Sequence, residues 1–338
     1  MKALTLKDTN VLKGIAILLL ILHHCLYTGE GYDDIVLFGH PLFQNIGEFS
    51  KLCVALFVFL SGYGLTAKTQ KDGGIDCIWK FYRHRYMKLM LNYWVIYLIF
   101  VPIGILFFHR TFPVVYGENW LFKAIVDFLG LYKAIIGDFH GYNATWWFFG
   151  VIIILYLIYP LLWRYRRFCF LMIPMGIMVP TVASFLPFFG PSDFGHYFMA
   201  FVCGMAFAYK KPELGGVNVI ERLFLLLLLL LACFFRFYAW NPFVWDAGII
   251  IFGVVLYSLT IIPQWISITL AFLGKHSYNI FLFHTFIYYY YFHDYIYWSR
   301  NPIIIPLTLM IVCIPISMII ELIKNKVKIV NLQKVLAG

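Results

Sequence analysis

Charged residues are scarce in this sequence of 338 residues. Only 12% of the residues are charged, whereas 62% are hydrophobic and 20% are aromatic. A chain of this composition has too few polar side chains to cover the surface of a soluble globule, and its apolar runs are long enough to cross a bilayer. The composition therefore excludes a soluble protein and predicts an integral membrane protein.

The sequence also lacks paired metal or disulfide ligands. Its seven cysteines stand singly, mostly within apolar runs, and no CxxC or Cys/His pair has the spacing of a zinc site. We expect the cysteines to pack in the core, with no disulfide framework and no metal ion. No small-residue cleavage site follows the first apolar segment, so we expect this segment to remain as the first span.

Long apolar runs predict an all-α, multi-pass protein with a single membrane domain over residues 1–338. The sequence contains about ten runs of the roughly 17–25 residues that a hydrocarbon core of about 30 Å requires. The predicted spans are 11–28, 49–67, 88–108, 146–163, 168–188, 194–209, 220–239, 243–262, 276–296 and 302–322. Segment 120–136 is weakly amphipathic and is open to an interfacial or re-entrant placement, so nine or eleven spans are alternatives.

The distribution of basic residues predicts the orientation. With the N-terminus in the cytoplasm, the cytoplasmic loops hold most of the 26 Lys and Arg residues, as the positive-inside rule requires. The outer side keeps Lys51, Arg110, Lys123, Lys133, Arg236 and Arg300. This bias favours both termini inside. The net charge of +10 needs no nucleic-acid partner.

The first span, VLKGIAILLLILHHC, contains a lysine and two histidines. His24 follows Lys13 by eleven residues, which is about 16 Å along a helix and nearly the same helical face. Ile17 and Leu20 complete this stripe, whereas His23 points about a quarter-turn away. An ionisable residue within a span is costly and is a functional hypothesis by default. The alternative is that both histidines are polar anchors at the outer interface.

This segment resembles the first-span motif of the acyltransferase-3 family of membrane O-acyltransferases, in which a basic residue, usually arginine, precedes a histidine at this spacing. Further segments resemble the family in chain order: LFVFLSGYGLT, FYRHRYMKLMLNYW, TWWFFGVIIILYLIYPLL and LGKHSYNIFLFHTFI. Lys13 departs from the family pattern because it keeps the charge but loses the planar guanidinium fork. The soluble SGNH-type domain of many relatives is not expected here, which leaves a stand-alone membrane unit.

The resemblance implies an O-acyltransferase of the cell (inner or plasma) membrane that uses cytoplasmic acyl-coenzyme A, most often acetyl-coenzyme A. The implied acceptor is a hydroxyl of an envelope or surface glycan or glycolipid. His24 is expected to act as the general base, because imidazole titrates near neutrality, or as an acyl relay. Arg83, Arg85 and Lys88, with Lys13, are expected to bind the phosphates of the coenzyme. The positive-inside bias alone would also place these residues on the cytoplasmic side.

Five further residues are candidates for the substrate cavity, and most of them have a structural alternative. They are His23, Ser61, Trp147, Tyr278 and His284. Ser61 suits close helix packing, and His284 suits a satisfied core histidine. Trp146, Trp147 and the run Tyr288 to Tyr291 suit an interfacial aromatic belt. The competing function is a polytopic glycan or lipid transporter or flippase, which often shows internal repeats that this sequence lacks.

Overall fold

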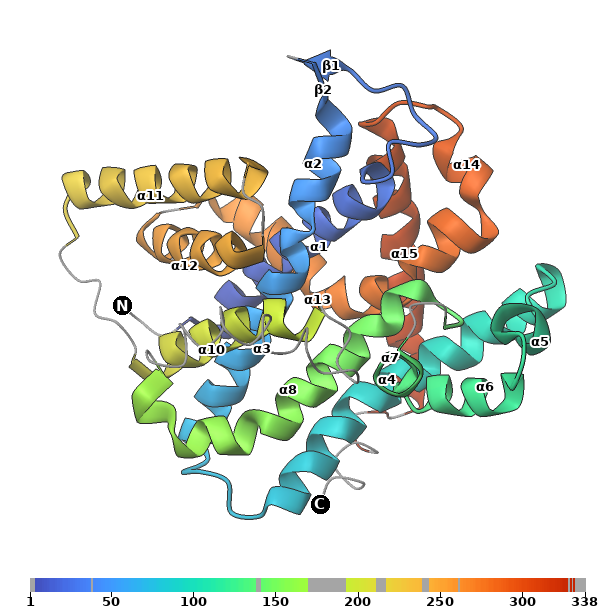
Figure 1. Ribbon diagram of the computed structural model, residues 1–338, viewed down its shortest axis with the longest axis horizontal. Helices are drawn as coiled ribbons and strands as arrows, with labels where there is room; N and C mark the ends of the chain where they lie inside the picture. Colours follow the sequence, from blue (N-terminus) through green and yellow to red (C-terminus); the bar gives the residue numbers. More distant parts are fainter. Residues whose placement is uncertain are drawn as a thin grey trace. The chain divides into compact units, whose positions relative to one another are not determined.

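The computed structural model describes residues 4–37, 39–137, 141–169, 193–210, 217–238, 243–260 and 262–327, with residues 329 and 331. Over these residues the chain is almost entirely helical (Figure 1). Two-residue strands, β1 (Val36–Leu37) and β2 (His40–Pro41), form one antiparallel pair. The all-α prediction is confirmed.

Helices lie where most spans were predicted. They are α1 (Leu6–Leu26), α2 (Leu42–Ser50), α3 (Leu52–Lys71), α4 (Ile78–Phe107), α8 (Trp147–Arg164), α10 (Asp193–Lys210), α11 (Val219–Tyr238), α12 (Phe243–Leu259), α13 (Gln264–Thr285) and α15 (Ile304–Lys326). Within the described residues, 5 helical segments are long and apolar enough to cross a membrane: Leu6–Leu26, Leu42–Lys71, Ile78–Phe107, Ala144–Arg164 and Ile304–Lys326. The predicted span 168–188 falls almost wholly outside the described residues. The ten spans and their orientation stay predictions.

Short helices connect the long ones. They are α5 (Phe112–Tyr116), α6 (Trp120–Phe128), α7 (Tyr132–Ile136), the 3₁₀ turns η1 (Ala144–Trp146) and η2 (Arg166–Phe168), the π-helical turn η3 (Phe286–Tyr291) and α14 (His293–Tyr297). Segment 120–136 is broken at Gly130, whose φ of 68° favours glycine. Helix α6 is about 14 Å long at 1.5 Å per residue, which is too short to cross a bilayer. This segment is therefore not an eleventh span.

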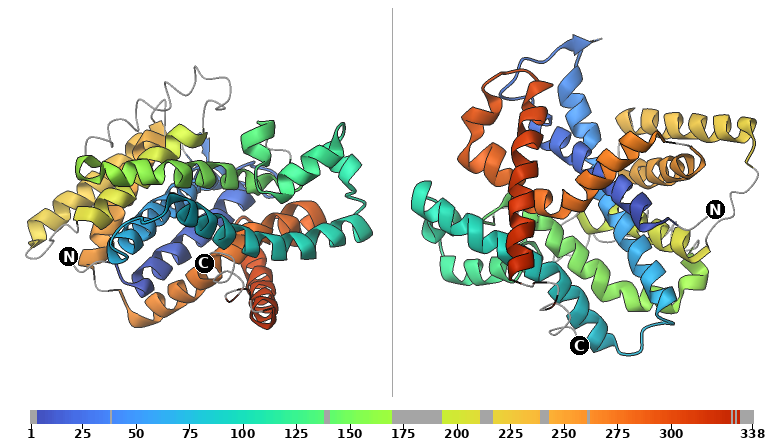
Figure 2. Two further views of the ribbon diagram at one scale, coloured as in Figure 1. Left: turned by 90° about the horizontal axis from the view of Figure 1, so that it is seen from below. Right: turned by 180° about the vertical axis from the view of Figure 1, so that it is seen from behind.

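The chain forms two compact units, which are described separately. The first comprises Met1–Leu20, Phe49–Ile75 and Ile158–Lys275, and includes α3, α10, α11 and α12. The second comprises Ile21–Glu48, Asp76–Leu157 and His276–Gly338, and includes α4 to α7, η3, α14 and α15. Figure 2 shows the same elements from two further sides. In the first unit α11 packs along α12 (Figure 1).

Glycines allow close helix contacts in the first unit. A Cβ added at Gly14 or Gly274 would collide with a backbone oxygen across the contact between α1 and α13, and one added at Gly62 or Gly204 would do so between α3 and α10. The oxygens belong to Leu270, Asn10, Phe201 and Phe59, in that order. Small residues let membrane helices approach closely enough for dispersion contacts to hold them together. These glycines therefore set the spacing of the unit.

Gly274 also explains one error in the sequence prediction. The predicted span 276–296 left Gly274 outside a membrane helix, but Gly274 lies inside α13, which begins at Gln264. The glycine serves a close approach to the backbone of Asn10 rather than a chain reversal. A polar, glycine-containing stretch was thus taken for a loop, although it forms a helix contact.

We predict that Gly274→Ala lowers the stability of the protein by about 1–3 kcal/mol, because the added methyl group overpacks the contact with Asn10. The matched control is Gly253→Ala in α12, where nothing lies within 4 Å of an added Cβ. The control should be neutral or stabilising by up to about 1 kcal/mol. Thermal unfolding of both variants in detergent measures the difference. Equal shifts in their midpoints would contradict the close contact.

Candidate active site

His24, near the end of α1, lies against a second histidine in the second unit. The ring centroids of His24 and His284 are 4.9 Å apart, with the ring planes inclined at 52°. The Tyr288 hydroxyl lies 3.2 Å from His24 Nδ1. His284 is 0% exposed and Tyr288 is 7% exposed, whereas His24 is half-buried. Helix α1, helix α13 and the turn η3 thus bring three side chains together, here called the His24 cluster.

His284 is held by its own helix. Its Nδ1 lies 3.0 Å from the carbonyl oxygens of both Ile280 and Phe281. A carbonyl oxygen only accepts hydrogen bonds, so Nδ1 carries the hydrogen and Nε2 carries the lone pair. Tyr288 follows four residues later in the turn η3, and its ring stacks on that of His284 at 17°. The backbone of α13 thereby fixes the ring that contacts His24.

His23 is bound to a different element. Its Nδ1 donates to the carbonyl oxygen of Gly47 at 2.8 Å, and its ring lies 4.8 Å from that of Tyr27. The contact with Gly47 directs the His23 ring toward helix α2. Its neighbour His24 also contacts the Tyr27 ring, but His24 Nδ1 lies beside the Tyr288 hydroxyl, so the Nδ1 atoms of the adjacent histidines have different partners.

The other predicted cavity residues are distributed over both units. Tyr278, on α13, donates its hydroxyl hydrogen to the carbonyl oxygen of Leu89 on α4 at 3.1 Å. Trp147 is half-buried at the start of α8. Lys13 and Ser61 are also half-buried, but they belong to the first unit. Within the second unit, the structure brings His284 together with His24.

The aromatic-belt prediction is wrong for several residues. Trp146 is 5% exposed, and its Nε1 donates to the carbonyl oxygen of Leu282 at 2.9 Å. Within the run Tyr288 to Tyr291, Tyr289 is 59% exposed, whereas the hydroxyls of the other tyrosines bind within the protein. These rings are packed against the helices of the second unit rather than displayed at a membrane surface.

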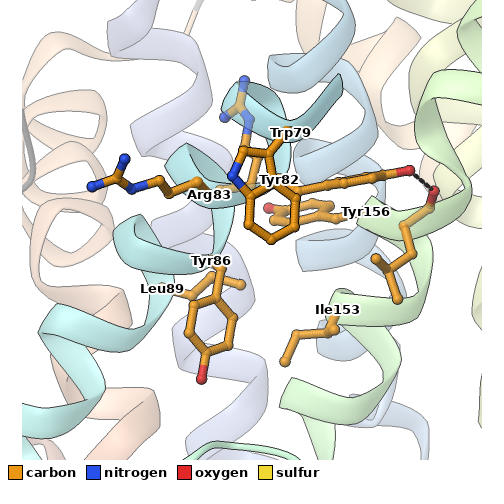
Figure 3. A pocket seen from close by; sticks show the side chains of 9 residues that line it. Trp79, Tyr82, Arg83, Tyr86, Leu89, Ile153 and Tyr156 are labelled. Carbon is orange, nitrogen blue, oxygen red and sulfur yellow. Dashed lines mark hydrogen bonds between the residues drawn. The ribbon is translucent and has the colours of Figure 1, made fainter. Parts of the chain in front are cut away.

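Arg83 and Arg85 line a cavity of about 350 Å³ between α4 and α8 in the second unit (Figure 3). The remaining lining residues are aromatic or aliphatic: Trp79, Tyr82, Tyr86, Leu89, Ile153, Tyr156 and Leu157. In Figure 3 the Arg83 side chain extends away from the rings. Tyr82 donates to the carbonyl oxygen of Leu157 at 2.7 Å. Lys88 is exposed and does not line this cavity.

Helical spacing explains how α4 presents this cavity. Trp79, Tyr82, Arg83 and Tyr86 recur at intervals of three and four residues, which places them on one face of the helix. Helix α4 begins at Ile78, ten residues before the predicted start of the span. The basic run predicted to enter the span therefore forms the first turns of the same helix.

Asp127 is a buried carboxylate that the sequence analysis did not select. It is 1% exposed, and its Oδ2 accepts hydrogen bonds from the Tyr116 hydroxyl at 2.6 Å and the Tyr142 amide at 2.7 Å. Burial raises the pKa of Asp127 to about 6, although both hydrogen bonds oppose the rise. A single acid in the apolar stretch WLFKAIVDFLG was the available signal. Asp127 thus binds Tyr142, at the start of the segment that leads to Trp146. The Trp146 indole in turn donates to the Leu282 carbonyl of α13.

We predict that Asp127 makes stability fall as the pH rises from about 4 to about 6. Its pKa is raised from 3.8 to about 6 on folding, so in this window the folded protein keeps a proton that the unfolded chain has lost. Asp127→Asn keeps an acceptor oxygen and should abolish this slope. Thermal midpoints of both proteins across the window test the prediction, and parallel curves would contradict it.

Comparison with protein families identifies the chain. The family model described as an acyltransferase domain matches residues 6–322 of the 338 residues. Comparisons with curated proteins and with solved structures gave no match. The matched range begins with α1 and ends within α15, so it includes both the His24 cluster and the arginine-lined cavity. The chain therefore belongs to the acyltransferase-3 family of membrane acyltransferases.

Proposed function

We propose that this acyltransferase moves an acetyl group from cytoplasmic acetyl-coenzyme A to a hydroxyl of an envelope or surface glycan or glycolipid. The protein would act as an O-acyltransferase of the inner or plasma membrane. The observation that carries the proposal is the contact of His24 with His284 and Tyr288 in the same unit as an arginine-lined cavity. Membership of the family supports the transfer of an acyl group.

The cavity beside Arg83 and Arg85 suits the nucleotide end of the donor. Guanidinium groups bind phosphate oxygens through paired, charge-assisted hydrogen bonds. The rings of Trp79, Tyr82 and Tyr156 give a planar base an aromatic surface on which to stack. A volume of about 350 Å³ lies within the range of small-molecule sites. Phosphate and adenine recognition can therefore occur in one place.

One hydrogen bond joins a helix that lines the cavity, α4, to the helix that carries His284, α13. Leu89 lines the cavity, and its carbonyl oxygen accepts the hydrogen bond from Tyr278. Tyr278 precedes His284 on α13 by six residues, which is about 9 Å along the helix axis. The pantetheine arm of the coenzyme is longer than this. A donor whose pantetheine arm starts near Leu89 would therefore have the reach to bring its thioester to the level of His284.

His24 supplies the base in the proposed reaction. Its unprotonated nitrogen takes the proton from the acceptor hydroxyl as the hydroxyl oxygen attacks the thioester carbonyl carbon. The carbon–sulfur bond then breaks, and the proton passes from His24 to the departing thiolate, which gives an ester and free coenzyme A. His24 is better suited than His284 because it is half-buried, whereas His284 is fully buried.

We predict that His24→Ala lowers the rate of acetyl transfer at least about 100-fold, which is the lower range for loss of a general base. Release of free thiol from acetyl-coenzyme A by the purified protein in nanodiscs measures the rate. His23→Ala should be milder, because His23 binds the Gly47 carbonyl. Full activity of the His24 variant would refute its assigned role. An acyl group trapped on His24 and detected by mass spectrometry would establish the relay instead.

We predict that Arg83→Gln and Arg85→Gln each weaken binding of coenzyme A about 10-fold, which corresponds to about 1.4 kcal/mol. The control is Lys80→Gln, an exposed residue of α4 that does not line the cavity. Isothermal titration compares the three variants with the original protein. If Lys80→Gln weakens binding as much as the arginine variants do, general attraction to the basic helix would explain the result.

A further inference from the structure

The hydroxyl of Tyr288 contacts Nδ1 of His24. The other ring nitrogen, Nε2, is then the atom that can act as the base. The distance between Tyr288 Oη and His24 Nδ1 is 3.2 Å, which is within hydrogen-bond range. Tyr288 is 7% exposed, and its ring lies 5.8 Å from the rings of both His24 and His284. The phenol is therefore buried against the imidazole that it contacts.

A π-helical turn holds Tyr288 in this place. Helix α13 ends at Thr285 and continues as η3, Phe286–Tyr291, with a wider turn. Such turns are rare and frequently occur at functional sites. The turn is anchored beyond Tyr288, because the Tyr290 hydroxyl accepts from the Ala144 amide at 3.1 Å and the Tyr291 hydroxyl donates to the Phe100 carbonyl at 2.7 Å. Tyr288 thus belongs to a fixed segment.

We infer that Tyr288 is a positioning residue, whose oxygen accepts a hydrogen bond from Nδ1–H of His24 and so fixes the tautomer and the orientation of the ring. This inference rests on the proposed role of His24 as the base. With the hydrogen on Nδ1, the lone pair resides on Nε2, where a base must present it. When Nε2 takes a proton, the hydrogen bond from Nδ1 to the phenol strengthens, because its donor is then charged. The phenol acts like the third group of a catalytic triad, without a charge of its own.

The surroundings of His24 determine which titrations can obscure this effect. The titratable side chains in ring contact with His24 include His23 and Tyr27 from α1, His284 from α13 and Tyr288 from η3. His23 donates to the Gly47 carbonyl, and His284 donates to carbonyls of its own helix. A change at Tyr288 that leaves these bonds intact therefore reports on His24.

The test is Tyr288→Phe, which removes only the hydroxyl. We expect kcat for thiol release from acetyl-coenzyme A to fall about 10- to 100-fold with little change in KM, since a misoriented base slows the chemical step. The acid limb of the pH profile should also move to lower pH, because the imidazolium loses its acceptor. The matched control is Tyr297→Phe, since the Tyr297 hydroxyl donates to the Cys25 carbonyl of α1 at 3.1 Å. That variant also loses a buried phenol contact with α1, but its acid limb should not move.

The outcomes separate this inference from the proposed function. An unmoved acid limb in Tyr288→Phe, or an equal shift in Tyr297→Phe, overturns the positioning role. Activity retained in His24→Ala overturns the proposed function itself. If Tyr288→Phe does not fold, 3-fluorotyrosine at position 288 keeps the shape of the ring and weakens the oxygen as an acceptor. It should shift the limb in the same direction by a smaller amount, and an unchanged profile would again overturn the role.

Discussion

The need to satisfy polar side chains without water governs the second unit. In an apolar interior an unpaired polar group costs several kcal/mol, so each must bind another part of the protein. Here the partners are often backbone carbonyls. His284 binds those of Ile280 and Phe281, His23 binds that of Gly47, and Trp146 binds that of Leu282. The ring that meets His24 is rigid because α13 itself supplies the acceptors.

The same constraint links the loop residues to this site. Asp127 accepts two hydrogen bonds at one oxygen, and one of them comes from the Tyr142 amide. The segment that follows Tyr142 continues to Trp146, whose indole donates to the Leu282 carbonyl of α13, the helix that carries His284. An acid on a short helix therefore contributes to the shape of a site that it does not touch. Its pKa is raised because burial outweighs its hydrogen bonds.

The helices and the first histidine could be predicted from the sequence, because apolar length and an ionisable residue within it are visible in one segment. Contacts between segments that lie far apart in the sequence could not be predicted from it. Gly274 resembled a turn residue, although it permits a helix contact, and the start of α13 was consequently misplaced. His284 was predicted as a candidate cavity residue, but Tyr288 was assigned to a run of interfacial tyrosines. A π-helical turn has no simple sequence period, so the direction of Tyr288 was hidden.

Helix α4 has 30 residues and is about 45 Å long, which exceeds a hydrocarbon core of about 30 Å. Its first turns, which carry Trp79 and Arg83, are largely exposed. Substitutions at exposed positions usually change stability by less than about 0.5 kcal/mol. The residues of these turns can therefore change while the packed helices of the second unit stay intact. The exposed first turns of α4 can thus accept substitutions more readily than the packed part of the same helix.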